Sequence, residues 1–149
     1  MLEQLASGSV VLGRFAIDKL AGQGGMGAVY RAVDQKTGSP VALKVLFNAE
    51  DEARFLREAQ LLAELRHPGI VGYVHHGHTE KGQPFLAMEW LSGCDLAEKL
   101  RTDGLTLRET LLLTQKACET LSQTHQRGLV KPCITGEIES SRAGRLKSK

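Results

Sequence analysis

The fold is decided by a glycine-rich stretch, Gly22-Gln23-Gly24-Gly25-Met26-Gly27-Ala28-Val29. Glycines at this spacing let the backbone approach phosphate groups, because no Cβ blocks the contact and a positive φ costs nothing. The segment that follows, Tyr30-Arg31-Ala32-Val33, carries aromatic and β-branched residues at the spacing of a strand. A dinucleotide-binding turn would instead open a helix directly after its third glycine. The stretch therefore predicts a hairpin whose turn binds phosphate.

A lysine follows this loop in a position that suits phosphate binding. It ends the run Val41-Ala42-Leu43-Lys44, which is apolar enough to belong to a central strand. Because side chains alternate along a strand, Ala42 and Lys44 point to the same face. The small side chain leaves room for a flat base, and the ammonium group can bind phosphates as a point charge. The alternative is a lysine at a strand edge that only extends its charge into water.

Hydrophobic periodicity predicts the order of the remaining elements. Strands are expected at residues 14–20, 28–34, 41–47, 70–76 and 84–90, with one helix after the third strand. That helix begins after a cap at Asn48, has Asp51 in its first turn, and ends at His67-Pro68-Gly69. A short helix over 95–100 and a long helix over 106–126 follow. Thr106 and Glu109 have the spacing of a capping box.

Composition and charge favour a soluble globular protein without a resident metal. The chain is 42% hydrophobic and 24% charged, and its net charge of +2 gives no reason to propose nucleic-acid binding. The first twelve residues do not form a signal peptide, and no apolar run is long enough to cross a membrane. The three cysteines have no paired short spacing, and the histidines lack a metal-ligand pattern. These features predict reduced thiols and a cytoplasmic location.

The motifs, taken in order, resemble the bacterial serine/threonine protein kinases over about residues 12–130. The resemblance rests on residues 24–32, 41–44, 55–58 and 67–71. It implies an α+β fold in which a kinase small lobe, with a five-stranded antiparallel sheet and one helix, fills residues 12–91 together with a hinge. Two helices of a partial large lobe would follow over 92–130. Residues 1–11 are then an N-terminal lead and residues 131–149 a basic, disordered tail.

The resemblance also implies an ATP site. Its catalytic candidates are Lys44, which would bind the phosphates, and Glu58, which would form an ion pair with Lys44. The ATP-binding candidates are Gly22, Gln23, Gly24, Gly25, Met26, Gly27, Val29, Ala42, Lys44, Met88, Glu89, Leu91 and Asp95. Two alternatives stay open: Glu58 is one of several surface glutamates on its helix, and Met88 and Trp90 are core residues.

Within this implied site, each candidate has a role taken from the family. Met88 would lie at the back of the pocket, and the backbone of Glu89 and of Leu91 would hydrogen-bond the adenine edge. Asp95 would contact the ribose or the substrate. Ala21 stands where the family usually carries a larger aliphatic residue over the adenine. Losing that contact costs about 1–2 kcal/mol, so we expect weak ATP binding.

A second departure concerns phosphate transfer. The reaction needs a catalytic-loop aspartate, and an asparagine and a further aspartate for Mg²⁺. In the family a stretch such as the one ending at Val130 leads into His-Arg-Asp-Leu-Lys-Pro, but here Lys131 and Pro132 follow at once. No aspartate occurs after Asp103. Mg²⁺ is expected for the family, yet its protein ligands are missing, so this chain alone is predicted not to transfer phosphate.

The sequence leaves two classes of function open. The leading interpretation is a serine/threonine kinase fragment that binds ATP, from a gene that is truncated or frameshifted at Lys131. The alternative is a non-catalytic, pseudokinase-like regulatory module. It would dock a partner protein on the leucine-rich face of residues 107–122, which the absent large lobe would otherwise cover.

Overall fold

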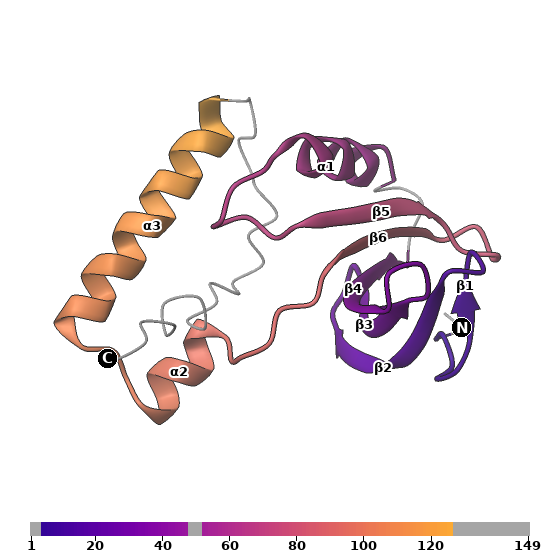
Figure 1. Ribbon diagram of the computed structural model, residues 1–149, viewed down its shortest axis with the longest axis horizontal. Coiled ribbons are helices and arrows are strands. Elements are labelled where there is room, and N and C mark those ends of the chain that lie inside the picture. Colours follow the sequence, from indigo (N-terminus) through magenta and orange to yellow (C-terminus); the bar gives the residue numbers. More distant parts are fainter. Residues whose placement is uncertain (1–3, 48–51, 127–149) are drawn as a thin grey trace. The chain divides into compact units, whose positions relative to one another are not determined.

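The computed structural model describes residues 4–47 and 52–126 (Figure 1). The elements are β1 (Val10–Val11), β2 (Phe15–Gln23), β3 (Gly27–Asp34), β4 (Ser39–Leu46), α1 (Glu52–Glu64), β5 (Tyr73–His78), β6 (Pro84–Glu89), α2 (Leu96–Thr102) and α3 (Leu107–Gln126). They belong to two compact units. Of the described residues, the first unit comprises 4–47, 52–66 and 71–90, and the second comprises 67–70 and 91–126.

The first unit is built on an antiparallel sheet with the strand order β1-β2-β3-β4-β6-β5. The predicted α+β class and element order are confirmed, but the described sheet has six strands where five were expected. The additional strand, β1, lies in the stretch predicted to be a lead. Its Val11 is buried and pairs with Phe15, and the connecting turn uses Leu12 and Gly13 at φ 51° and 58°.

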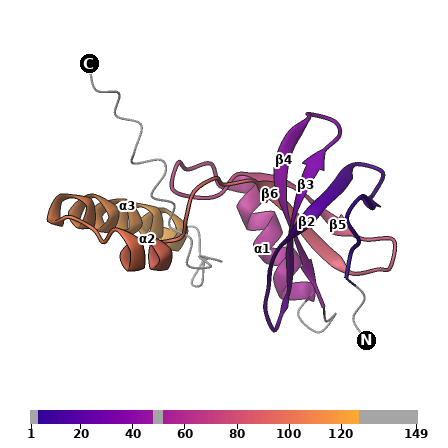
Figure 2. The same cartoon turned by 90° about the horizontal axis from the view of Figure 1, so that it is seen from below.

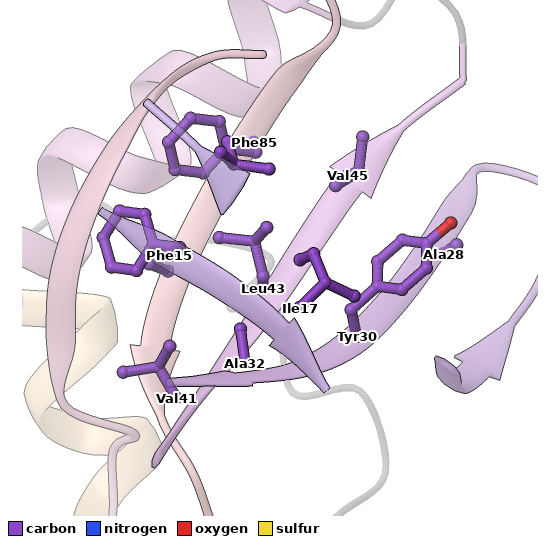
Figure 3. Close-up of a cluster of buried hydrophobic side chains, with 11 residues drawn as sticks. Phe15, Ile17, Ala28, Tyr30, Ala32, Val41, Leu43, Val45 and Phe85 are labelled. Atoms are coloured by element: carbon purple, nitrogen blue, oxygen red, sulfur yellow. The ribbon is translucent and has the colours of Figure 1, made fainter. Parts of the chain in front are cut away.

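One face of the sheet forms the main core, because alternate residues of β2, β3, β4 and β6 point into it. The buried members are Val11, Phe15, Ile17, Ala28, Tyr30, Ala32, Val41, Leu43, Val45, Phe85 and Ala87 (Figure 3). The rings of Phe15 and Phe85 meet edge to face with centroids 5.8 Å apart. This contact joins the β2 and β6 strands, which are not neighbours in the sheet.

The opposite face of the sheet packs against α1. Phe55 and Ala59 of the helix are buried with Leu46 and Leu86 of the sheet. Figure 2 shows α1 beside the sheet, where it contacts mainly β5 and β6. The helix therefore has an apolar side fixed on the sheet, as its periodicity predicted.

A buried ion pair lies in the first unit. Arg14 donates from Nε and Nη2 to the two carboxylate oxygens of Asp34, each at 2.8 Å, and Asp34 is only 1% exposed. The carboxylate also accepts the backbone N–H of Lys36 at 3.0 Å. The guanidinium of Arg14 is the main cause that holds the pKa of Asp34 down at about 2.

One predicted strand begins later in the structure, and two other predictions lie outside the described residues. The strand expected at 70–76 begins at Tyr73, because the Ile70 N–H bonds the His67 carbonyl at 3.0 Å and closes a turn there. The predicted cap at Asn48, with Asp51, and the predicted tail over 131–149 fall outside the described residues.

The second unit contains α2 and α3, each with a side-chain cap. Asp95 accepts the Glu98 N–H at 2.7 Å and begins α2. The predicted capping box of α3 is confirmed: Thr106 N–H donates to Glu109 Oε2 at 2.8 Å, and Glu109 N–H donates to Thr106 Oγ1 at 3.2 Å. Among the residues that the structure describes, neither these helices nor α1 is long and apolar enough to span a bilayer.

Candidate functional site

The glycine-rich stretch forms the tip of the β2–β3 hairpin, as predicted. Gly22 pairs with Val29, and the Gly24 N–H bonds the Gly27 carbonyl at 2.9 Å across the turn. The expected positive φ is not found in this loop, since none of its four glycines adopts one. Residues 22–26 of the loop are instead exposed to solvent, and Met26 at its tip is 66% exposed.

The loop glycines have two different reasons to lack a Cβ. At Gly22, Gly24 and Gly25 an added Cβ would meet nothing within 4 Å, so the backbone is open to an approaching group. At Gly27 an added Cβ would lie 2.2 Å from the Val45 carbonyl oxygen, so this glycine is required by the fold itself. The first three glycines therefore keep a surface accessible, and the fourth lets β3 pack against β4.

The strand register places several predicted site residues on one face of the sheet. Val29 lies opposite Lys44, and Ala42 lies opposite Met88. Partners in an antiparallel register project to the same side, and so do residues two apart on one strand. The shared face of Ala42 and Lys44 is thus confirmed, and Val29 and Met88 join them on it.

These side chains are half-buried on the same face that carries α1. Met88 packs against the cluster under α1, so it is both a core contact and a site candidate. Glu58 of α1 has a 21% exposed side chain, and its carboxylate lies 3.4 Å from Arg54 Nε one turn earlier. The pairing of Glu58 with Lys44 stays a prediction.

The end of β6 carries further polar contacts. Glu89 donates its backbone N–H to the Gly72 carbonyl at 2.8 Å, and its Oε1 accepts the Gly72 N–H at 3.0 Å. Trp90 follows, with the guanidinium carbon of Arg31 5.7 Å from its ring centroid. Sequence reasoning did not single out Arg31 or Gly72, because neither the register nor the close approach at Gly72 can be read from residue types.

Three remaining candidates lie elsewhere. Gln23 ends β2 and accepts a hydrogen bond from Gln4 at 2.8 Å. In the second unit, Leu91 is half-buried, and the Asp95 carboxylate caps α2. The described parts of the chain contain no group of three or more histidine, cysteine, aspartate or glutamate side chains arranged to hold a metal ion.

Comparison with known proteins identifies the class. The model of the protein kinase domain matches residues 15–131. The chain is 36% identical to the DNA damage-responsive serine/threonine-protein kinase RqkA of Deinococcus radiodurans, over 88% of this chain and 20% of the relative. It is 34% identical to the serine/threonine-protein kinase PknA of Mycobacterium tuberculosis, over 94% of this chain and 35% of the relative.

A solved structure agrees with these relatives. The kinase domain of Mycobacterium tuberculosis PknI superposes with a TM-score of 0.71 at 31% identity, over 87% of this chain and 56% of that domain. The chain belongs to the protein kinase family, and its resemblance to the bacterial serine/threonine kinases is confirmed. It spans about a fifth to a third of the length of these curated relatives.

Proposed function

We propose that this chain is an ATP-binding part of a serine/threonine protein kinase. The observation that carries the proposal is the face formed by Val29, Ala42, Lys44 and Met88 beside an open glycine loop. A base fits against the small Ala42, and the phosphates fit between the Lys44 ammonium and the loop backbone. ATP binding is expected of the family as a whole.

The proposed chemistry of this chain stops at binding. Phosphoryl transfer requires carboxylates that orient the substrate hydroxyl and hold Mg²⁺. The sequence contains no aspartate after Asp103, and the described residues offer no metal cluster. When bound to such carboxylates, Mg²⁺ would neutralise charge on the phosphates. The residues present fit the phosphates but not the metal, so no transfer step is assigned to this chain.

The glycine loop and Lys44 supply the test of ATP binding. Replacing Lys44 with methionine, or Gly24 and Gly25 together with alanine, should raise the ATP Kd roughly tenfold or more, because contacts to charged phosphates are lost or blocked. The glycine double variant should keep its stability, since both added Cβ atoms meet open space. Isothermal titration with ATP measures the Kd, and thermal unfolding measures the stability.

The control is Lys36→Met, which removes an exposed lysine from the turn between β3 and β4, at the end of β3 opposite the glycine loop. It should bind ATP like the unmodified chain. Equal ATP affinity in all variants would contradict the proposal, as would stabilisation by NAD in preference to ATP. Incorporation of γ-phosphate into a substrate by this chain, abolished by Lys44→Met, would contradict the absence of transfer.

A second candidate function is a pseudokinase-like module that docks a partner protein. It is favoured by the exposure of Leu107, Leu111 and Leu112 on α3, which are 77%, 62% and 44% exposed. This function predicts a stable, soluble chain that co-purifies with one specific protein. Recovery of the chain only from inclusion bodies would speak against it.

A further inference from the structure

Arg31 makes a contact that the kinase motifs do not explain. Its guanidinium carbon lies 5.7 Å from the centroid of the Trp90 ring, within the range of a cation–π interaction. Trp90 directly follows β6 and stands beside Glu89, whose backbone is a predicted adenine contact. Arg31 itself lies on β3 opposite Ala42, on the face that carries the other site candidates. The arginine therefore joins the nucleotide face to the segment after β6.

A bulge in β2 directs a carboxylate to this arginine. Ile17 pairs with Ala32 and Lys19 pairs with Arg31, so Asp18 is the extra residue between two register positions. Bulges re-aim side chains in this way. The Asp18 carboxylate forms an ion pair with Nη1 of Arg31. The guanidinium is thus held by a carboxylate from one strand while it faces the indole ring.

Glu89, the residue before Trp90, is held in place by contacts with Gly72. Glu89 and Gly72 exchange two hydrogen bonds, of 2.8 Å and 3.0 Å, and an added Cβ at Gly72 would lie 3.2 Å from Glu89 Cδ. Consecutive residues 89 and 90 are therefore anchored in two directions: Glu89 to the backbone that leads into β5, and Trp90 to Arg31.

We infer that Arg31 is a positioning residue for nucleotide binding. Held by Asp18, its guanidinium stacks on Trp90 and fixes the backbone of Glu89 in place for the base. This inference rests on the proposed ATP-binding function, and it adds Asp18 and Arg31 to the residues on which ATP affinity depends. Neither residue contacts the base or the phosphates; both act through Trp90.

The test uses intrinsic fluorescence, since Trp90 is the single tryptophan of the chain. Without nucleotide, Arg31→Met and Asp18→Asn should shift the Trp90 emission and increase its quenching by acrylamide. With ATP, Arg31→Met should raise the Kd roughly two- to fivefold, the scale of an exposed cation–π contact. Arg31→Lys retains the charge and should recover part of both effects. Arg101→Met, which removes an exposed arginine of α2, is the control and should change neither.

Five outcomes decide between support and rejection of this inference. A raised Kd with an unchanged thermal midpoint, partly recovered in Arg31→Lys, supports the inference. Unchanged Trp90 fluorescence in Arg31→Met overturns it, as does altered fluorescence with an unchanged ATP Kd. A Kd that rises only in proportion to lost thermal stability also overturns it, because the role is then structural. Failure of the unmodified chain to bind ATP overturns the proposed function and this inference with it.

Discussion

At the scale of single residues, pH acts most directly on the Arg14–Asp34 pair. Asp34 is buried and accepts two hydrogen bonds from Arg14, so the folded state favours its charged form. The pKa of its carboxyl falls from 3.8 to about 2. A depressed folded-state pKa means that the unfolded chain takes up the proton first. The stabilisation is therefore fully present above about pH 5 and is lost progressively as the pH falls below 3.8 and through the folded-state pKa of about 2.

Replacing Asp34 with asparagine tests this contribution. At pH 7 the variant should lose about 2 kcal/mol of unfolding free energy, because the Arg14 guanidinium keeps its burial and loses its counter-charge. The loss should fall to roughly a third of that value near pH 2.5, where the unfolded-state carboxyl is almost fully protonated and the folded-state carboxyl begins to take up its proton. Urea unfolding followed by Trp90 fluorescence, at pH 7 and near pH 2.5, measures the difference.

The control for this experiment is Asp103→Asn. Asp103 pairs with Lys99 at 2.8 Å, but its side chain is 65% exposed, and exposed pairs contribute little. Its substitution should leave the unfolding free energy nearly unchanged at both pH values. An equal destabilisation of the Asp34 variant at pH 7 and near pH 2.5 would contradict the assigned cause.

Single residues of the site were predictable where a short-range rule applies. Alternation along β4 correctly placed Ala42 and Lys44 on one face. The Asp18–Arg31 contact was not predictable, because it depends on a bulge in β2 that the residue types of this strand do not indicate. The glycine loop was predicted from two properties of glycine, the missing Cβ and the freedom to adopt a positive φ, and only the first applies. Its open space matters, whereas positive φ values occur at other glycines, such as Gly38 and Gly82.

At the scale of elements, the start of α3 is fixed by a reciprocal side-chain cap. Thr106 and Glu109 exchange hydrogen bonds with the backbone of each other. The same Thr106 groups lower the pKa of the Glu109 carboxyl, since they bind its charged form. This cap satisfies N–H groups that a helix end otherwise leaves without partners.

Thr106→Ala should therefore fray the first turn of α3. The expected cost is about 1 kcal/mol, the usual value for losing a threonine cap. Hydrogen exchange of the amides in the first turn should accelerate, while amides in the middle of the helix keep their protection. Thr114→Ala is the matched control, because Thr114 lies inside the same helix and bonds only the Thr110 carbonyl. Equal exchange in both variants would contradict the role of the cap.

Elements with their own periodicity were predictable, and short ones were not. α1 follows from apolar spacing, and α2 and α3 follow from apolar spacing together with their caps, which are local signals. β1 has only two residues, so no period can be read from it. It exists because Val11 is buried against the core of distant strands. β5 starts late because the turn at His67–Ile70 uses backbone bonds that compete with the ladder.

At the scale of the whole molecule, the most exposed of the described leucines lie in the second unit. The second unit exposes Leu100 of α2 as well as the leucines of α3, at 54% for Leu100. The main apolar residues of the first unit are instead buried between its strands and under α1. Apolar surface in water favours association with other surfaces.

Leu107→Gln combined with Leu111→Gln should make the chain more soluble. Both leucines are more than half exposed, so little packing is lost. We expect the precipitation limit to rise roughly severalfold, with ATP binding unchanged. Polyethylene glycol precipitation measures the limit. Leu12→Gln, an exposed leucine of the first unit at 47%, is the control. An equal effect of the control would show that α3 is not the cause.

The N-terminal residues cover the edge of β2, which limits how far the chain can be shortened from that end. Gly8 N–H and the Ser9 carbonyl bond the backbone of Ile17, and Ser7 Oγ donates to the Asp18 carbonyl. Residues 7–11 thus cover hydrogen-bonding groups that would otherwise template pairing with another chain. A boundary drawn at residue 12, where the sequence placed the start of the lobe, would strip that cover. We therefore expect a chain shortened to residue 12 to leave the edge of β2 open to pairing with another strand.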